Sequence, residues 1–325
     1  MPPAASGAKG VLVNFEELFG HLGQHTVDGL AKGAIYALVA LGYTLVYGVL
    51  KLINFAHSEV FMVGTFAVLG TWTTLGATNN PPLGMMLLFL VAGLVAGALA
   101  SGATAVAVER IAYKRLREMN APPLIFLITA IGLSLVLSEA FGIWQGRLVV
   151  GMPVILPQKV LFSIGDTAVT NTQLLTLIAA LVMMFALDQF INHTRYGRGV
   201  RAVAQNPDTA ALMGVNKDRV IMLIFLLGGL LAGAAALLYA IRYGNTRFNV
   251  GFLLGLKAFT AAVLGGIGNL RGALLGGLLL GVVEVYAATL TQSNWEDVAA
   301  FIVLVVVLLF RPTGLLGESL GRARA

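Results

Sequence analysis

The feature that most constrains this chain is a series of apolar runs long enough to cross a lipid bilayer. A helix rises about 1.5 Å per residue, so about 20 apolar residues span a hydrocarbon core of about 30 Å. Nine runs lie near residues 27–50, 53–76, 83–108, 122–145, 173–191, 219–241, 250–268, 272–290 and 297–310. They are continuous rather than alternating, and an open strand cannot satisfy its backbone in lipid, so the pattern predicts helices.

Composition supports the same fold class. The chain is 58% hydrophobic and 11% charged, against about 25% charged in soluble proteins, and its mean hydropathy is +0.87. We therefore expect an all-α, polytopic membrane protein with about eight to nine transmembrane helices, surrounded by lipid. Cysteine is absent, which excludes disulfides and thiolate metal sites. The net charge of +6 is interpreted as membrane topology, and no nucleic-acid partner is expected.

The chain divides into one large domain and two short ends. Residues 1–24 lack the pattern of a cleavable signal peptide, and the apolar residues from Phe15 to Leu22 fall at helical spacing, which predicts an interfacial helix. Residues 25–317 form the expected transmembrane domain, and 318–325 a cytoplasmic tail. Within the domain, loop 146–172 is the longest external connection. It either covers the mouth of the bundle, the favoured interpretation, or meets an external partner.

Orientation follows from basic residues, which stay in short cytoplasmic loops. Nine alternating crossings put fourteen of the 21 Lys and Arg residues on one side: Lys51, Arg110, Lys114, Arg115, Arg117, Arg195, Arg198, Arg201, Lys217, Arg219, Arg271, Arg311, Arg322 and Arg324. The N-terminus is then outside and the C-terminus cytoplasmic. A re-entrant segment at 250–268 would change the count.

A polar segment, residues 195–219, interrupts the apolar pattern on the cytoplasmic side. Asn206 is a candidate N-cap, Pro207 suits the first helical position, and Gly214 supplies a stop. Asp208 lies where the helix dipole favours an anion. A helix of about two turns is marginal alone in water. We therefore expect it to dock, either on the membrane surface or on a partner.

A second polar group begins the run NFAHSEVFMVG at residues 54–64. Asn54, His57 and Glu59 either mark a helix entry at the cytoplasmic boundary, with Asn54 as N-cap, or form a hinge or gate beside a translocation path. The first interpretation is slightly favoured.

Three further charges interrupt apolar runs: Glu139, Lys257 and Glu284. If residue 250 is near the outer boundary of the membrane and residue 271 near the inner one, Lys257 lies roughly 10 Å from the outer boundary and Glu284 roughly 20 Å from the inner one. In a hydrocarbon core of about 30 Å these two depths nearly coincide. Because an unpaired charge in the membrane is costly, we predict a structural Lys257–Glu284 ion pair. The alternative is an ion-driven carrier that uses all three charges as coupling sites.

Glycine is abundant between residues 251 and 281. The four-residue spacings of Gly272 with Gly276 and of Gly277 with Gly281 predict close helix packing. Gly265 and Gly266 could instead open a helix and expose backbone groups to a substrate, which makes them candidate path residues beside Asn54, His57 and Glu59.

Sequence signatures of catalysis are missing. There is no phosphate-binding loop, HExxH motif or nucleophile elbow, and the four histidines at 21, 25, 57 and 193 form no metal pattern. We predict a chain that is not an enzyme, binds no metal or cofactor, and does not hydrolyse ATP by itself.

Four segments in order resemble the permease subunits of bacterial ABC importers for branched-chain amino acids, across about residues 27–317. They are GAIYALVALGYTLVYGVLKLINFAHSEVFMVG at 33–64, NPDTAALMGVNKDRV at 206–220, KAFTAAVLGGIGNLRGALLGGLLLGVVE at 257–284 and RPTGLLG at 311–317. The family commonly has Gly where this chain has Ser58. The resemblance implies a multi-pass permease of the bacterial inner membrane. A urea or short-amide importer of the same architecture is the alternative within transport.

The resemblance also implies partners. They are a homologous second permease, two cytoplasmic ATPase subunits that bind ATP and Mg, and an external solute-binding protein. The segment at 195–219 then looks like the family's coupling helix, which moves with the ATPases. The implied coupling residues are Arg198, Arg201, Asn206, Pro207, Asp208, Ala211 and Gly214.

Overall fold

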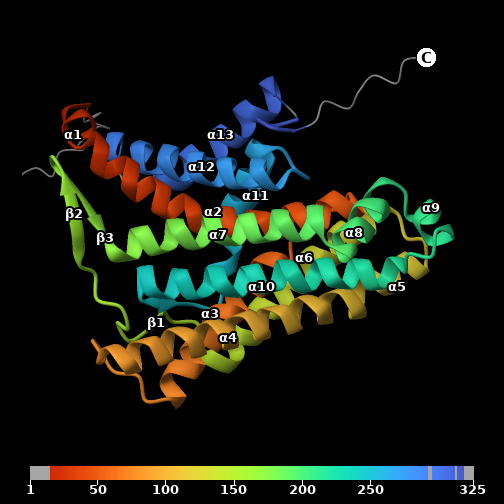
Figure 1. Cartoon of the computed structure of the whole chain (residues 1–325), viewed down its shortest axis with the longest axis horizontal. Coiled ribbons are helices and arrows are strands. Elements are labelled where there is room, and N and C mark those ends of the chain that lie inside the picture. Colours follow the sequence, from red (N-terminus) through yellow and green to blue (C-terminus); the bar gives the residue numbers. More distant parts are fainter. Residues whose placement is uncertain (1–14, 292–294, 312, 318–325) are drawn as a thin grey trace, which may run out of the picture.

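The computed structural model describes residues 15–291, 295–311 and 313–317, and shows a bundle of roughly aligned helices (Figure 1). A helix occupies each of the nine apolar runs. The helices are α1 (Phe15–Gly20), α2 (Leu22–Leu50), α3 (His57–Thr74), α4 (Leu83–Val108), the π-helical turn η1 (Glu109–Tyr113), α5 (Lys114–Glu118), α6 (Pro123–Gln145), α7 (Asn171–His193), α8 (Arg195–Gln205), α9 (Pro207–Leu212), α10 (Lys217–Tyr243), α11 (Val250–Gly265), α12 (Leu270–Leu290) and α13 (Glu296–Phe310).

Six helical stretches of the described chain are long and apolar enough to cross a membrane: α2, α4 continued through α5, α6, α7, α10 and α12. α3, α11 and α13 are shorter, at 18, 16 and 15 residues. The expected all-α polytopic class is confirmed for the described residues. The count of eight to nine crossings and the orientation of the termini stay predictions. Residues 1–14 and 318–325, which belong to the two predicted end segments, lie outside the described residues.

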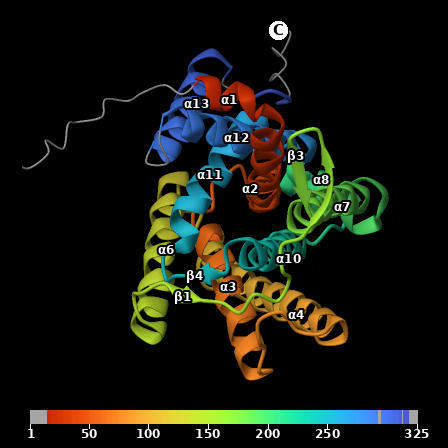
Figure 2. The ribbon, with the colours of Figure 1, turned by 90° about the vertical axis from the view of Figure 1, so that its left-hand side faces the viewer.

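Small residues let the inner helices pack almost backbone to backbone. A Cβ on Gly33 of α2 would overlap the carbonyl oxygen of Gly277 in α12, and one on Gly281 would overlap Gly29 and Gly33. On the other side of α12, a Cβ on Gly272 would overlap Gly265 of α11. The close packing predicted from glycine spacing is confirmed. Most of α2 and α10 is buried, whereas few residues of α4, α6 and α7 are, as expected for lipid-facing helices. Figure 2 shows these three helices at the periphery of the bundle.

Four short strands lie at one end of the bundle. β2 (Val160–Ile164) and β3 (Thr167–Thr170) form an antiparallel hairpin, and β1 (Val150–Gly151) pairs with β4 (Asn245–Thr246) after α10. The backbone of Val154 also bonds the α3–α4 connection through Asn79 and Asn80. These contacts tie loop 146–172 across the bundle end, as the interpretation of this loop as a cover predicts. Figure 1 shows this hairpin end opposite the end that carries α5, α8 and α9, called the α9 end below.

Candidate functional site

The polar segment at 195–219 folds as two short helices at the α9 end. Thr194 caps α8 by accepting a hydrogen bond from the backbone N–H of Gly197 at 3.0 Å, so α8 begins at Arg195. Gly197 packs against the carbonyl of Ile191, where a Cβ would overlap it. The Arg201 guanidinium donates to the same carbonyl. Arg198 is exposed. α8 is therefore fixed to the end of α7.

α9 projects from this support. Asn206 caps it by accepting hydrogen bonds from the N–H groups of Asp208 and Thr209, both at 3.0 Å, and Pro207 occupies the first position; both expectations are confirmed. Gly214 has a φ of +84°, which favours glycine and ends the helix.

The face of α9 beyond these caps is open. Of its six residues only Ala210 is buried; Asn206 to Thr209, Ala211 and Gly214 are exposed. Leu212 and Met213 are 87% and 81% exposed. Exposed apolar side chains of this kind are typical of surfaces that meet a protein or a membrane. The sequence analysis did not identify Leu212 and Met213, although two adjacent apolar residues before Gly214 were a usable signal.

The polar group at the start of α3 differs from the favoured sequence interpretation. α2 ends at Lys51 with a φ of +55°, residues 52–56 are not helical, and Ala56 is the N-cap residue. The expectation that Asn54 caps the helix with its side chain is wrong. Its backbone carbonyl accepts from the N–H of His57 at 3.1 Å, while its side chain points to another helix.

This group is buried inside the bundle. Asn54, His57 and Glu59 are at most 2% exposed. The His57 ring fills the space beside Gly42, where a Cβ would overlap it. Gly42 precedes the end of α2 by about 12 Å of helix. The non-helical segment 52–56 therefore carries the chain from the α9 end back into the bundle before α3 begins.

Hydrogen bonds link this group to neighbouring helices. The Tyr113 hydroxyl in η1 donates to Oδ1 of Asn54 at 3.1 Å. Oε1 of Glu59 accepts from the hydroxyl of Ser134 in α6 at 3.2 Å. The Ser58 hydroxyl lies 3.4 Å from the same oxygen and donates to the carbonyl of Phe55 at 2.7 Å. Oε2 of Glu59 and Nε2 of His57 are buried and have no hydrogen-bond partner among the described residues. Unpaired buried polar atoms are costly and therefore mark a site of interest.

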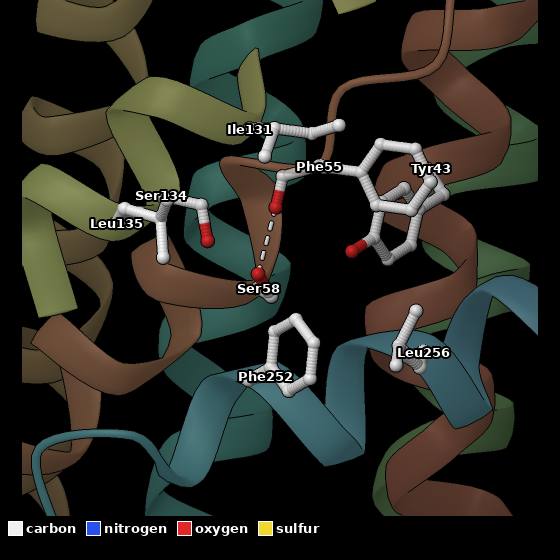
Figure 3. A pocket seen from close by; sticks show the side chains of 8 residues that line it. All are labelled: Tyr43, Phe55, Ser58, Ile131, Ser134, Leu135, Phe252 and Leu256. Atoms are coloured by element: carbon white, nitrogen blue, oxygen red, sulfur yellow. Dashed lines mark hydrogen bonds between the residues drawn. The ribbon is translucent and has the colours of Figure 1, made fainter. Parts of the chain in front are cut away.

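A cavity of about 210 Å³ opens beside this group (Figure 3). Three hydroxyl-bearing side chains also line it, Tyr43 of α2, Ser58 of α3 and Ser134 of α6, and their oxygens form only a small part of its surface. The remaining lining is apolar and comprises Phe55, Ile131, Leu135, Phe252 and Leu256. Figure 3 shows the Tyr43 and Ser134 hydroxyls on opposite sides of Ser58, above α11. The arrangement combines an apolar surface with a compact polar corner.

The structure brings Lys257 and Glu284 together. Their side chains form a salt bridge between α11 and α12 in which Glu284 is fully buried. Lys257 also bonds Glu296 at 3.3 Å and Asp297 at 2.6 Å, and Lys32 of α2 contacts Glu296 and lies 3.6 Å from Glu284. Lys32, Glu296 and Asp297 were not predicted as members of this cluster, because a depth match alone does not say which helices are neighbours.

The other candidates lie elsewhere. Glu139 is half exposed and pairs with Arg147 at 2.5 Å, outside the buried charge cluster. Gly265 ends α11 against Gly272 of α12, and Gly266, with a φ of +106°, packs on Thr313 and Gly317. The glycine run thus forms the α11–α12 turn, whose neighbours are the chain after α13 rather than the polar group at Asn54.

Known proteins match this chain along nearly its whole length. A family model described as branched-chain amino acid transport system / permease component matches residues 25–308. The permease protein BraD of the high-affinity branched-chain amino acid transport system of Pseudomonas aeruginosa is 42% identical over 301 residues, covering 92% of this chain and 96% of BraD. LivH of Escherichia coli K12, from a system of the same description, is 37% identical over 305 residues, or 93% and 97% of the two chains.

A more distant relative, the probable branched-chain amino acid transport permease protein LivH of Methanocaldococcus jannaschii, is 26% identical over 295 residues, or 87% of this chain and 89% of that one. The similarity therefore extends across bacteria and archaea.

Proposed function

This chain belongs to the family of branched-chain amino acid transport system permease components, and we propose that it carries branched-chain amino acids into the cytoplasm as one transmembrane subunit of an ABC importer. The observation that carries the proposal is the 42% identity with BraD along 92% of the chain. The protein is a multi-pass permease of the cytoplasmic membrane.

Nine membrane segments are proposed, with α3, α11 and α13 added to the six long spans. Each runs along the bundle in the opposite direction to the membrane helix before it (Figure 1). The N-terminus is then outside with the hairpin end, and the C-terminus is cytoplasmic with the α9 end. The basic residues flanking α5, α8 and α10 support this orientation.

The energy source in this proposal is ATP hydrolysed with Mg on separate ATPase subunits, because the sequence has no phosphate-binding loop. α9 is the surface that meets them. Its capped N-terminus, the exposed Ala211, and the projecting Leu212 and Met213 support this role. Arg201 anchors the supporting helix, while the exposed Arg198 and Asp208 flank the contact.

The buried group of Asn54, His57 and Glu59 is the proposed gate. It lies where α3 begins inside the bundle, beside a cavity, and each of its side chains is buried. Gly265 and Gly266 are proposed as a turn that lets α11 and the chain after α13 move as a unit. A homologous second permease and an external binding protein complete the complex.

The alternatives have less support. An ion-driven carrier needs exchangeable charges in the path, but Lys257 and Glu284 are held in a five-residue network and Glu139 is half exposed. A urea importer does not account for a mostly apolar cavity. Uptake of labelled leucine and urea by the reconstituted complex, with and without the ATPase subunits, distinguishes the branched-chain amino acid importer, the urea importer and the ion-driven carrier.

A further inference from the structure

We propose that the cavity between α2, α3, α6 and α11 is a binding subsite for the transported amino acid, which takes its apolar side chain on one wall and its ammonium group at the hydroxyl corner. This inference rests on the proposed function and adds a location and a binding mode to it. It uses residues outside the predicted gate, namely Tyr43, Ser134, Leu135 and Phe252.

The hydroxyl corner, formed by Tyr43, Ser58 and Ser134, contains serine oxygens that can accept further hydrogen bonds. The Ser58 hydroxyl donates its proton to the carbonyl of Phe55 at 2.7 Å, and the Ser134 hydroxyl donates to Glu59 at 3.2 Å. Each serine oxygen therefore keeps lone pairs but has no proton left to donate. A ligand group rich in N–H donors satisfies both oxygens. An ammonium group is such a donor.

Glu59 supplies the matching charge. Its carboxyl group lies beside the two serines, is 1% exposed, and forms no salt bridge with a basic side chain of the described residues. Its second oxygen has no hydrogen-bond partner within the described chain. A cation bound beside this buried carboxyl group favours its ionised form, and the interaction is strong because little water screens it.

The Tyr43 hydroxyl provides a hydrogen-bond donor, in contrast to the two serine oxygens, which accept. It is buried, has no hydrogen-bond partner in the described residues, and points toward Ser58 at the edge of the cavity (Figure 3). Since a phenol can donate, it can bind the carboxylate of a ligand whose ammonium lies on the serines. One hydroxyl donor next to two acceptors and a negative charge matches the head group of an α-amino acid.

The apolar wall selects the side chain. Ile131 and Leu135 from α6 face Phe252 and Leu256 from α11 across the cavity. Ligand pockets for drug-sized molecules usually measure about 300–1,000 Å³, so a cavity of about 210 Å³ suits a smaller molecule. A branched aliphatic side chain covers this apolar wall. Urea would leave the wall in contact with water, and a lipid chain would leave the hydroxyls without hydrogen-bond partners.

Photo-crosslinking with L-photo-leucine, a leucine analogue with a diazirine in its side chain, tests the subsite in the full complex in proteoliposomes. Uptake of the analogue is measured first, and adducts are then mapped by mass spectrometry. We expect adducts on peptides that contain residues 131–135 or 252–256, and we expect excess leucine to suppress them. Transport of the analogue with adducts elsewhere, or with adducts that leucine does not reduce, overturns the subsite and leaves the proposed function intact. If the complex does not transport the analogue or leucine, the proposed function fails and the subsite fails with it.

A pair of neighbouring substitutions provides the control. Leu135 and Val136 are equally exposed, at 60% and 63%, but only Leu135 lines the cavity. Leu135→Trp fills the cavity and is expected to lower leucine uptake and crosslinking about tenfold. This is the size of effect that changes in an apolar substrate pocket usually have. Val136→Trp is expected to stay within about twofold of wild type. Basal ATP hydrolysis verifies assembly of both variants. Wild-type leucine uptake by Leu135→Trp overturns the proposal.

Discussion

The hydroxyl of Tyr113 donates a hydrogen bond to Oδ1 of Asn54 over 3.1 Å, joining the π-helical turn after α4 to the segment that enters α3. Tyr113 is fully buried between the rings of Phe126 and Phe225, at 5.7 and 5.1 Å between centroids. π-helical turns are rare and often occur at functional sites. This turn therefore connects the proposed gate to the helices that end near α9.

The same turn continues toward the α9 end of the bundle. Arg117 pairs with Glu109 at 2.7 Å and with Asp218 at 3.2 Å, and Asp218 lies in the first turn of α10, directly after the α9 segment. Glu109 is 2% exposed, so this contact is largely shielded from water. We expect a displacement of α9 to be transmitted toward Asn54 through Asp218, Arg117 and the η1 turn that holds Glu109 and Tyr113.

Tyr113→Phe removes only the hydroxyl and leaves Asn54 Oδ1 buried without its donor, which costs about 1–3 kcal/mol. We expect leucine uptake per ATP hydrolysed to fall, while membrane insertion and basal ATP hydrolysis persist. Tyr239→Phe is the control, because the Tyr239 ring contacts Phe61 edge to face and its hydroxyl forms no hydrogen bond with the described residues. Equal coupling ratios in the two variants would contradict a positioning role for Tyr113.

Loss of one charge from the buried cluster should be more harmful than loss of a matched pair. Lys257→Met leaves Glu284 buried with one fewer partner, and breaking a buried pair costs about 3–5 kcal/mol. Lys257→Met combined with Glu284→Met is expected to recover part of this loss. A charge swap should recover less, because it puts a carboxylate beside Glu296 and Asp297. The amount of folded protein after detergent extraction and heating measures the effect.

The exposed pair on α6 serves as the control for the cluster. Glu139→Gln removes a salt bridge to Arg147 whose two side chains are 49% and 65% exposed. Exposed pairs contribute about 0–1 kcal/mol, so this variant should heat-denature like wild type. An equal loss from Glu139→Gln and Lys257→Met would argue against a special contribution of the buried cluster.

The projecting end of α9 should control ATPase coupling. Leu212→Ala with Met213→Ala removes two exposed apolar side chains and leaves the caps of α9 intact. We expect weaker co-purification of the ATPase subunits and at least about a tenfold loss of uptake, as for anchor residues of an interface.

Asp208→Lys and Gly214→Pro should separate uptake from ATP hydrolysis. Lysine at position 208 opposes the dipole at the start of α9, and proline cannot adopt the φ of +84° at Gly214. Normal uptake in all three variants would exclude α9 as the coupling surface.

Helix packing gives a test that does not depend on transport. A Cβ on Gly277 would lie 2.6 Å from the backbone of Ala37 in α2, whereas one on Gly132 in α6 meets nothing within 4 Å. Gly277→Ala should therefore lower the yield of folded protein, because backbones would have to separate. Gly132→Ala should be neutral or stabilising, by up to about 1 kcal/mol. The two variants can be compared by fluorescence-detected size exclusion.

Much of the helical architecture could be predicted from apolar runs, because continuous hydrophobicity has few solutions in lipid. The capping of α9 was also predictable, since Asn206 and Pro207 act locally. The contact of Lys257 with Glu284 followed from depth and the cost of an unpaired charge. Each of these inferences needs only local geometry or one coordinate along the membrane normal.

The remainder depends on which helices are neighbours. Asn54 has the residue type of an N-cap, but Lys51 turns the chain back into the bundle and Tyr113, 59 residues away, takes its side chain. Lys32 joins the charge cluster because α2 packs on α12 through glycines. The cavity combines side chains from four separate parts of the chain. None of these relationships has a periodic signature in the sequence.

The most direct test of the proposed importer is leucine uptake into proteoliposomes that contain this chain, its second permease and two ATPase subunits, with binding protein added outside. We expect accumulation of labelled leucine that requires ATP, Mg and the ATPase subunits, and that unlabelled isoleucine or valine reduces while urea does not. Leucine uptake that persists without the ATPase subunits and collapses with an ion gradient, or ATP-dependent uptake of urea without leucine, would contradict the account.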